Sequence, residues 1–296
     1  YSLDHNFMKR LRHFCEELKP GFALIGEVLF GDYNLIVNDE MLHSCTNYEC
    51  YKGIYSSFNS MNMFEIAHSL NRQYGPEQWC IYRGKHLMTF VDNHDVSRLA
   101  TILTNKNHIP LAYGLLFGMP GIPCIYYGSE WGEEGAKAPD NDYALRPCFE
   151  EPKPNELTAF IKALISLRRE SDALCNGTYH NVVITNHQLV FERRTDSERV
   201  LVAINASDSE YTAGSHELNG TFSRILAYPG EFKALASEEA AVEDAEDKDT
   251  CSAADDIPAD NTADTSENQE AAAADIVTLN GQITMPAYSV QYLKMQ

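Results

Sequence analysis

The stretch FVDNHDVSRL, residues 90–99, joins an apolar run to a cluster of titratable side chains. The run LMTFV, residues 87–91, has the continuous hydrophobicity of a strand that is buried on both faces. It ends abruptly in DNHD, residues 92–95. Catalytic groups of parallel α/β folds gather where the strands end, at the carboxyl edge of the sheet. These ten residues therefore predict a buried parallel strand with a functional site at its end.

Two other apolar runs end in the same way. FALIG, residues 22–26, is followed by Glu27, and IPCIYYG, residues 122–128, is followed by Ser129 and Glu130. A single carboxylate at an exposed strand end is common and needs no functional explanation. Three consecutive strands that each end in an acidic group favour one shared site instead.

Helical segments separate these strands. Residues 4–18 begin with Asp4 as a helix N-cap and place a stripe of apolar side chains on one face. The stripe consists of Phe7, Leu11, Phe14 and Leu18. Further helices are expected at residues 58–74, 110–119 and 156–170. Apolar strands that alternate with helices predict an α/β fold with parallel strands covered by helices.

The pattern changes after residue 174. From residue 178 onward, apolar and polar residues alternate in several short runs, which predicts antiparallel strands and a small β-sandwich. We therefore expect one domain at residues 1–174 and a second at residues 175–296. Residues 237–275 interrupt the second domain with fourteen Asp and Glu against one Lys, and with no aromatic residue. This composition predicts a disordered surface insertion, with a partner or cation site as the alternative.

Charge and cysteine content exclude several classes of function. The formal net charge of −20 argues against nucleic acid as a partner, because phosphates would be repelled. No apolar run approaches the roughly 18–20 residues of a membrane span, so no membrane association is expected. The eight cysteines form no CxxC pair, and scattered thiols favour a reducing compartment, which predicts a cytoplasmic protein. No nucleotide, flavin or haem motif is present, and no cofactor is predicted.

Three motifs together resemble the α-amylase family of glycoside hydrolases. They are GEV at residues 26–28, FVDNHDVSR at residues 90–98 and GIPCIYYGSEWG at residues 121–132, in the family's order. Residues 46–75 and the segment DNDYALRP, residues 140–147, resemble the neopullulanase and cyclomaltodextrinase branch. The resemblance implies the second half of a (β/α)8 barrel at residues 1–174, followed by an antiparallel β-sandwich domain.

The resemblance also implies roles for individual residues. Glu27 would be the general acid/base, with a pKa raised by an enclosed site. Asp95 would stabilise the oxocarbenium-like transition state, and His94 would hydrogen-bond the same sugar ring. The implied substrate-binding set is Asn93, His94, Glu130, Asp142 and Arg146. Tyr127 and Trp131 would line the cleft, with simple packing as the alternative. Calcium accompanies many family members, but no calcium ligands can be identified in this sequence.

The sequence departs from the family pattern at its start. The family's nucleophile is an Asp at the end of the fourth barrel strand, and it would fall just upstream of Tyr1. Asp4 cannot substitute, because it occupies a helix-cap position one turn too late. Retaining hydrolysis needs two carboxyl groups roughly 5 Å apart, so this chain alone is expected to be inactive. A half-barrel also leaves two open strand edges, which predicts that the chain forms homo-oligomers such as dimers, aggregates or is partly molten.

The expected activity is retaining hydrolysis of α-glucosidic bonds. The substrates would be α-glucans, including maltooligosaccharides, cyclodextrins and pullulan-like polymers. Two alternatives remain open, a transglycosylase of the same family and a non-catalytic α-glucan-binding protein. The intact set of Glu27, His94 and Asp95 argues against the second alternative, because a binding protein has no need for the acid/base.

Overall fold

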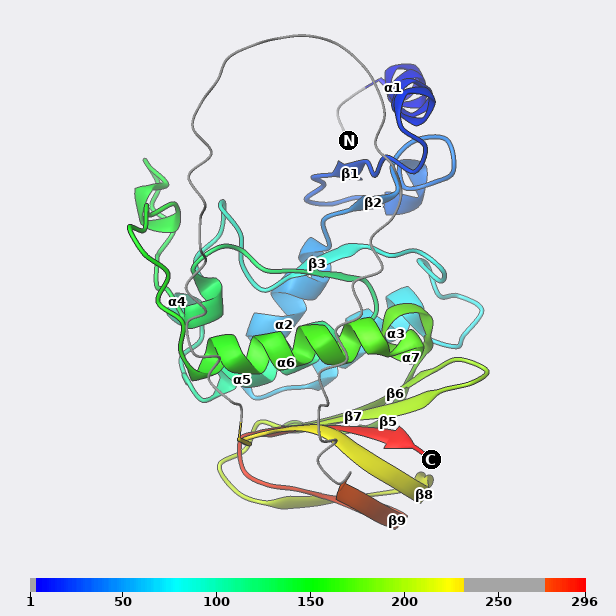
Figure 1. Cartoon of the computed structure of the whole chain (residues 1–296), viewed down its shortest axis with the longest axis vertical. Helices are drawn as coiled ribbons and strands as arrows, with labels where there is room; N and C mark the ends of the chain where they lie inside the picture. Colours follow the sequence, from blue (N-terminus) through cyan, green and yellow to red (C-terminus); the bar gives the residue numbers. More distant parts are fainter. Residues whose placement is uncertain (1–3, 232–274) are drawn as a thin grey trace, which may run out of the picture.

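The computed structural model describes residues 4–231 and 275–296 (Figure 1). An α/β part lies above an antiparallel β part in this view, and the polypeptide passes from one to the other after residue 176. The predicted acidic insertion at residues 237–275 lies outside the described residues, except for Asp275. No helix in the described ranges is long and apolar enough to cross a membrane.

Four short parallel strands form the centre of the α/β part. They are β1 (Ile25–Gly26), β2 (Ser44–Cys45), β3 (Met88–Phe90) and β4 (Ile122–Cys124). β1 pairs with β2 and β3 pairs with β4, both in parallel, and a single parallel bridge between Thr46 and Met88 joins the two pairs. The strands therefore lie side by side in sequence order, and their carboxyl ends meet at one edge.

Helices cover these strands. They are α1 (His5–Leu18), α2 (Tyr48–Ser60), α3 (Phe64–Tyr74), α4 (Leu99–Ile102), α5 (His108–Gly118), α6 (Glu156–Glu170) and α7 (Asp172–Asn176). Three short 3₁₀ turns accompany them: η1 (Tyr33–Leu35), η2 (Ser129–Trp131) and η3 (Tyr143–Leu145). The N-cap of α1 is Asp4, as predicted, and its carboxylate accepts a hydrogen bond from the backbone N–H of Phe7 at 2.9 Å.

The α/β part differs from the sequence prediction in two places. β2 was not predicted, because its residues Ser44 and Cys45 do not form an apolar run, although both are buried. The helix expected at residues 58–74 is two helices, α2 and α3. Met61 ends α2 with a φ of 51°, a left-handed conformation that a continuing helix cannot contain.

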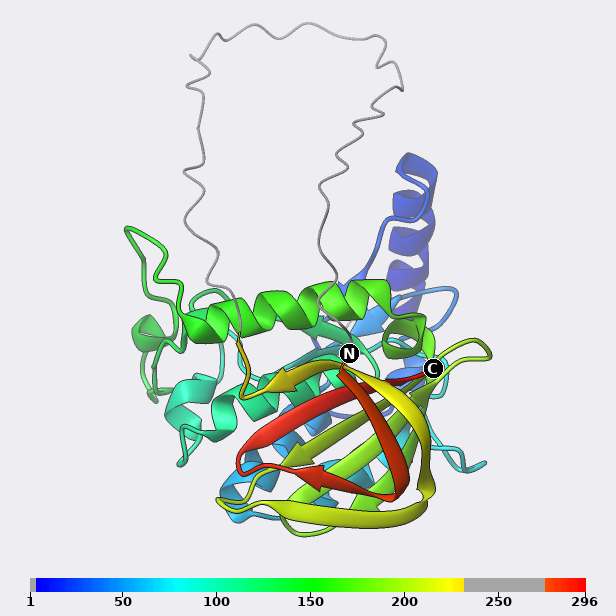
Figure 2. The ribbon, with the colours of Figure 1, turned by 60° about the horizontal axis from the view of Figure 1, so that its bottom comes forward.

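Six antiparallel strands form the second part. They are β5 (Thr178–Ile184), β6 (Gln188–Arg194), β7 (Arg199–Asn205), β8 (Tyr211–Tyr228), β9 (Asp275–Met285) and β10 (Ser289–Met295). Their order is β5-β6-β7-β10-β8-β9, so hydrogen bonds join all six into one sheet. The long strand β8 pairs with β9 along its first part and with β10 along its last part, and the sheet folds over on itself (Figure 2). The predicted sandwich is therefore corrected to one folded sheet, whose two layers enclose a small core.

Helix α5 lies between the two parts. Every residue of this helix is buried, and one side of it packs on β7 and β10. A Cβ atom on Gly114 would lie 2.8 Å from the side chain of Val290, so only glycine permits this close approach. The hydroxyl of Tyr292 donates a 2.5 Å hydrogen bond to the Gly114 carbonyl. One hydrophobic core thus includes residues on both sides of residue 174. The domain boundary expected there stays a prediction.

Helix α1 is packed far less completely. Phe7, Phe14 and Leu18 of the predicted apolar stripe are 55, 56 and 70% exposed, and Met8 is the buried residue of this helix. The outer edges of β1 and β4 likewise pair with no other strand in the described part of the chain. The apolar face that the sequence predicted exists and Leu11 packs against the core, but the other three side chains of the stripe are largely uncovered by the described residues.

Candidate active site

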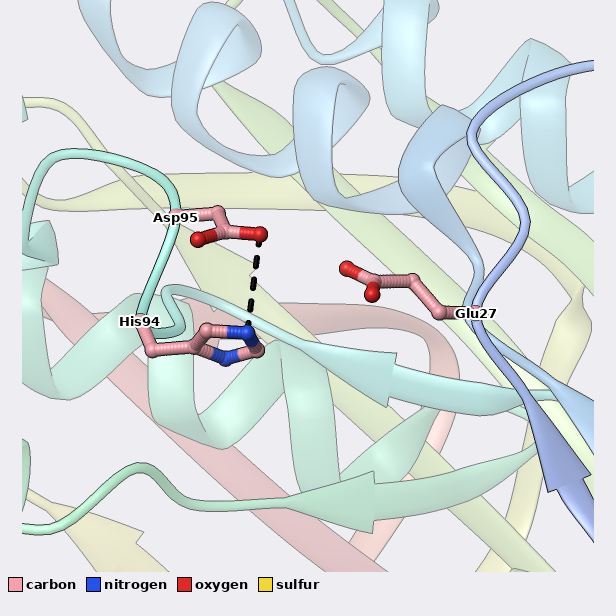
Figure 3. A group of neighbouring side chains, drawn as sticks. All are labelled: Glu27, His94 and Asp95. Carbon is pink, nitrogen blue, oxygen red and sulfur yellow. Dashed lines mark ion pairs between the residues drawn. The ribbon is translucent and has the colours of Figure 1, made fainter.

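Three predicted site residues meet at the carboxyl ends of the parallel strands (Figure 3). Glu27 follows β1, while His94 and Asp95 lie in the loop after β3. One ligand atom of each side chain lies within 4.8 Å of the others, and His94 Nε2 is 3.5 Å from an Asp95 carboxylate oxygen. Glu27 and His94 are exposed and Asp95 is half-buried. The expected convergence of strand ends is therefore present, whereas the described residues do not enclose Glu27.

Tyr48 connects Glu27 to Asn93. Its hydroxyl donates to Glu27 Oε1 at 3.2 Å and accepts from Asn93 Nδ2 at 3.1 Å. Burial raises the pKa of Tyr48, so its hydroxyl remains a proton donor at neutral pH. Asn93 is thus linked to Glu27 through Tyr48. Sequence reasoning missed Tyr48 because it follows β2, the strand that carries no apolar run.

Arg146 orients Asp95. Its Nη2 atom donates to Asp95 Oδ1 at 2.9 Å and to Asp142 Oδ2 at 3.3 Å, and its Nε donates to the His94 carbonyl at 3.2 Å. Lys137 Nζ donates to Asp142 at 2.5 Å, and this contact holds the pKa of Asp142 below its usual value. The guanidinium group thus holds the Asp95 carboxylate in a fixed position. Asp142 contacts Arg146 but lies outside the three-residue cluster.

The first residue of DNHD points inward. Asp92 is 2% exposed and accepts hydrogen bonds from the Leu99 N–H at 2.7 Å and from Ser129 Oγ at 2.8 Å. Burial raises its pKa, although these hydrogen bonds oppose the shift. Asp92 thus ties the end of β3 to the first residue of α4 and to the segment after β4.

Arg98 fixes the other end of the same loop. Its side chain is fully buried, and it donates to the carbonyls of Tyr127 at 2.6 Å and Leu145 at 2.8 Å, and to Ser129 Oγ at 2.9 Å. Since Leu145 precedes Arg146, this one guanidinium holds both the DNHD loop and the residue that orients Asp95. The apolar strand ends in titratable groups because some of them anchor the loop and others face outward from it.

The remaining predicted residues lie outside the three-residue cluster. Glu130, on η2, has a buried Oε2 atom with no hydrogen-bond partner among the described residues. The Tyr127 hydroxyl donates to the Pro147 carbonyl at 2.8 Å, and the ring of Trp131 packs against Phe149 at 5.1 Å between centroids. These contacts agree with the packing alternative, although the exposed ring of Tyr127 also leaves a surface on which a sugar can stack.

The cluster suits acid/base chemistry better than calcium binding. Glu27, His94 and Asp95 offer two carboxylates and one imidazole nitrogen. Calcium takes six to eight oxygen ligands, so this donor set does not fit it. Glu27 is instead an exposed carboxyl group, and Asp95 is a carboxylate held by Arg146. Such a pair is able to donate a proton on one side of a substrate bond and to present negative charge on the other side.

Paired carboxyl groups at the carboxyl ends of parallel strands define a site of the glycoside hydrolase type. The alpha amylase catalytic domain matches residues 2–151 of this chain. The chain belongs to the α-amylase family, as the motifs predicted.

The relatives include a cyclomaltodextrinase of Thermoanaerobacter pseudethanolicus, which is 27% identical over 235 residues. That match covers 74% of this chain and 38% of the relative. An intracellular maltogenic amylase of Bacillus subtilis is 28% identical over 213 residues, which cover 68% of this chain and 34% of the relative. The chain thus spans little more than a third of the length of these curated relatives.

Solved structures share the fold. An α-amylase of Geobacillus thermoleovorans, in complex with acarbose, superimposes with a TM-score of 0.72 at 17% identity. The superposition covers 99% of this chain and 57% of that one. The expected α-amylase barrel fold followed by an antiparallel domain is therefore confirmed.

Proposed function

We propose that this chain provides the acid/base side of the active site of a retaining glycoside hydrolase. The substrates are α-glucans or maltooligosaccharides, and the bond cleaved is an α-glucosidic bond. The convergence of Glu27, His94 and Asp95 within 4.8 Å is the observation that carries the proposal. The names of the relatives, cyclomaltodextrinase and maltogenic amylase, support the substrate class.

The proposed roles follow from charge and position. Glu27 donates its proton to the glycosidic oxygen as the bond breaks, and Tyr48 holds one carboxyl oxygen in place. Asp95, held in place by Arg146, stabilises the positive charge that develops at the anomeric carbon. His94 lies beside Asp95 and hydrogen-bonds the same sugar.

The covalent nucleophile is a third carboxylate. Retaining hydrolysis requires two carboxyl groups about 5 Å apart, one of which attacks the anomeric carbon. Asp95 is near enough to Glu27, but one of its oxygens is paired with Arg146 and the other faces His94. We therefore assign the nucleophile to an Asp outside residues 4–231 and 275–296, and we expect this chain alone not to hydrolyse glucan.

Two further proposals concern the association of the chain and its location in the cell. The unpaired edges of β1 and β4 favour association with another polypeptide segment, and a homo-oligomer is the form we expect for the chain alone. The seven cysteines in the described ranges are all free thiols, which favours a cytoplasmic location. The name of the intracellular relative agrees with that location.

The variant Glu27→Gln in the full-length protein tests the assignment. Hydrolysis of maltotriose should fall by about 10²–10⁴-fold, the usual contribution of general acid catalysis, while calorimetric binding of maltotriose stays within a few-fold. Glu170→Gln, on the exposed end of α6, is the matched control and should keep full activity. Unchanged hydrolysis in Glu27→Gln would refute the role of Glu27.

The same assays separate the alternatives. A wild-type protein that binds maltotriose but releases no product would favour the α-glucan-binding alternative. Longer products from maltotriose, in place of glucose and maltose, would favour the transglycosylase.

A further inference from the structure

A cavity of roughly 500 Å³ lies at the opposite end of the parallel strands from Glu27. Its walls come from the segment before β3, the segment before β4, and the turn between α7 and β5. We call it the basal pocket. Its volume is in the range of small-molecule sites, and it touches none of the proposed catalytic residues.

The basal pocket is basic in an otherwise acidic protein. Five residues able to carry positive charge line it, and no Asp or Glu does: the five are Arg83, Lys85, His86, His180 and Arg193. The whole chain, by contrast, has a net charge of −20. Of the five, His180 pairs with Glu217 at 2.9 Å, and Lys85 Nζ donates to the Val37 carbonyl at 2.6 Å. Arg83, His86 and Arg193 have no carboxylate partner within the described part of the chain.

Arg193 forms the buried wall of the basal pocket. It is 1% exposed and donates to the carbonyls of Gly118 and Gly177, each at 2.9 Å. Arg168 lies behind it and likewise donates only to backbone carbonyls, those of Phe117, Met119 and Gly121. Burial and the Arg168 charge together lower the pKa of Arg193 to about 9.

These two guanidinium groups leave positive charge that no described side chain neutralises. Carbonyls at the end of α5 offset part of it, because the carboxyl end of a helix is partially negative. Burial and the charges of Arg193 and Arg168 also lower the pKa of His86. An anion in the basal pocket would offset the remaining positive charge, since a buried charge without a counter-charge is costly.

Arg83 and His86 lie at the mouth of the basal pocket. Arg83 is exposed, and one nitrogen, Nη2, donates to the carbonyls of Gly75 at 2.9 Å and Glu77 at 2.6 Å. These bonds fix its planar head, and its other donors stay available for two-pronged contacts to an oxyanion. His86 is exposed, and neither ring nitrogen is hydrogen-bonded to a described residue. The buried rings of Tyr74 and Tyr179 add apolar wall on the inner side.

We propose that the basal pocket binds a small phosphate-bearing ligand. Arg83 and His86 contact the phosphate oxygens, the field of Arg193 favours the negative charge, and Tyr74 and Tyr179 pack against the rest of the molecule. The proposal is independent of the proposed hydrolase function, because the two sites lie at opposite ends of the strands.

Isothermal titration calorimetry on the full-length protein tests the proposal, with pyrophosphate as the first probe at constant ionic strength. We expect saturable binding at one site per chain and a concentration-dependent rise in Tm. The double variant Arg83→Gln/His86→Gln should bind at least tenfold more weakly. The control Arg169→Gln/His68→Gln removes the same residue types from exposed positions outside the basal pocket and should bind like the wild type.

Further probes identify the source of the phosphate. Equal affinity for inorganic phosphate and for a hexose 6-phosphate indicates a free oxyanion site, and tighter binding of the ester indicates a phosphorylated metabolite. If the double variant does not fold, the single variant His86→Gln, on an exposed side chain, should still weaken binding about threefold. No saturable heat, equal binding by the test and control variants, or an equal effect of chloride would overturn the proposal.

Discussion

The α/β part and the folded antiparallel sheet differ sharply in the length and pairing of their strands. The strands β1–β4 are two or three residues long, and the outer edges of β1 and β4 have no partner strand in the described ranges. The strands of the folded sheet are 7 to 18 residues long, and they pack on α5 on one side and enclose a second core on the other. Helices α2, α3 and α5 share one large core with this sheet, so the loosely packed region is the edge of the α/β part at α1, β1 and β4.

The proposed chemistry lies in the α/β part, and Glu27 directly follows β1, the strand at its open edge. Glu27 and Asp95 follow short strands whose ends are free to carry polar side chains, whereas inward-facing residues of the folded sheet are committed to its core. The site loops compensate locally, because Asp92 and Arg98 fix both ends of the DNHD loop with buried hydrogen bonds. The positions of the site side chains thus depend more on a few buried polar hydrogen bonds than on an extensive apolar core.

Replacing one phenylalanine by alanine in each part should give the largest difference in the free energy of unfolding. Phe191→Ala removes a fully buried ring from the folded sheet and should lower the free energy of unfolding by about 3–5 kcal/mol. Phe14→Ala removes a ring that is 56% exposed on α1 and should change it by less than about 0.5 kcal/mol. Urea denaturation monitored by circular dichroism measures both. Comparable losses would mean that another segment covers α1 in the protein.

Loss of the buried Arg98 side chain should have the next largest effect on the free energy of unfolding. Arg98→Met removes the donors to Tyr127, Ser129 and Leu145 and should cost about 2–4 kcal/mol of unfolding free energy, because the Tyr127 and Leu145 carbonyls lose their hydrogen-bond partner. Backbone amide hydrogen exchange in residues 93–97 should rise more than exchange in β6 and β7. The control Arg169→Met, on the exposed face of α6, should leave the exchange of residues 93–97 unchanged. If exchange rises equally everywhere, Arg98 does not act specifically on the DNHD loop.

The smallest expected effect is the change of stability with pH that Asp92 causes. Burial raises the pKa of folded Asp92 above its usual value near 3.8, so the folded state holds this proton more tightly than the unfolded chain. Its contribution to stability is therefore fully present below about pH 3.8 and is lost as pH rises through the folded pKa. Asp92→Asn is neutral at every pH and should gain stability relative to the wild type over that rise. A pH-independent difference in urea denaturation would show that Asp92 titrates normally.

The sequence predicted the elements that carry strong local signals. The runs before Glu27, DNHD and Ser129 are apolar and end in polar groups, so their strands and the meeting of their ends followed from general rules of parallel sheets. Strand β2 was missed because Ser44 and Cys45 form a two-residue strand without an apolar run, and it is defined only by its neighbours β1 and β3. Tyr48 was missed with it, since its role depends on where β2 ends.

Long-range packing accounts for the other differences. Alternation in residues 178–228 shows antiparallel strands, but one folded sheet differs from a two-sheet sandwich only in how β8 bends and pairs. The inward direction of Asp92 and the contact of Asp142 with Arg146 depend on side-chain positions that spacing does not specify. The stripe on α1 was found correctly, but a pattern of apolar residues does not reveal whether a partner covers them.

The most direct test of the proposed acid/base role uses two substrates that differ only in their leaving group. Glu27→Ala in the full-length protein should lose hydrolysis of maltotriose by at least 10²-fold, because the sugar leaving group needs a proton. An α-maltosyl fluoride releases fluoride without protonation, so its first step should persist, and added azide should give a glycosyl azide of retained α configuration. Equal loss on both substrates, or no rescue by azide, would contradict the assignment of Glu27 as the acid/base.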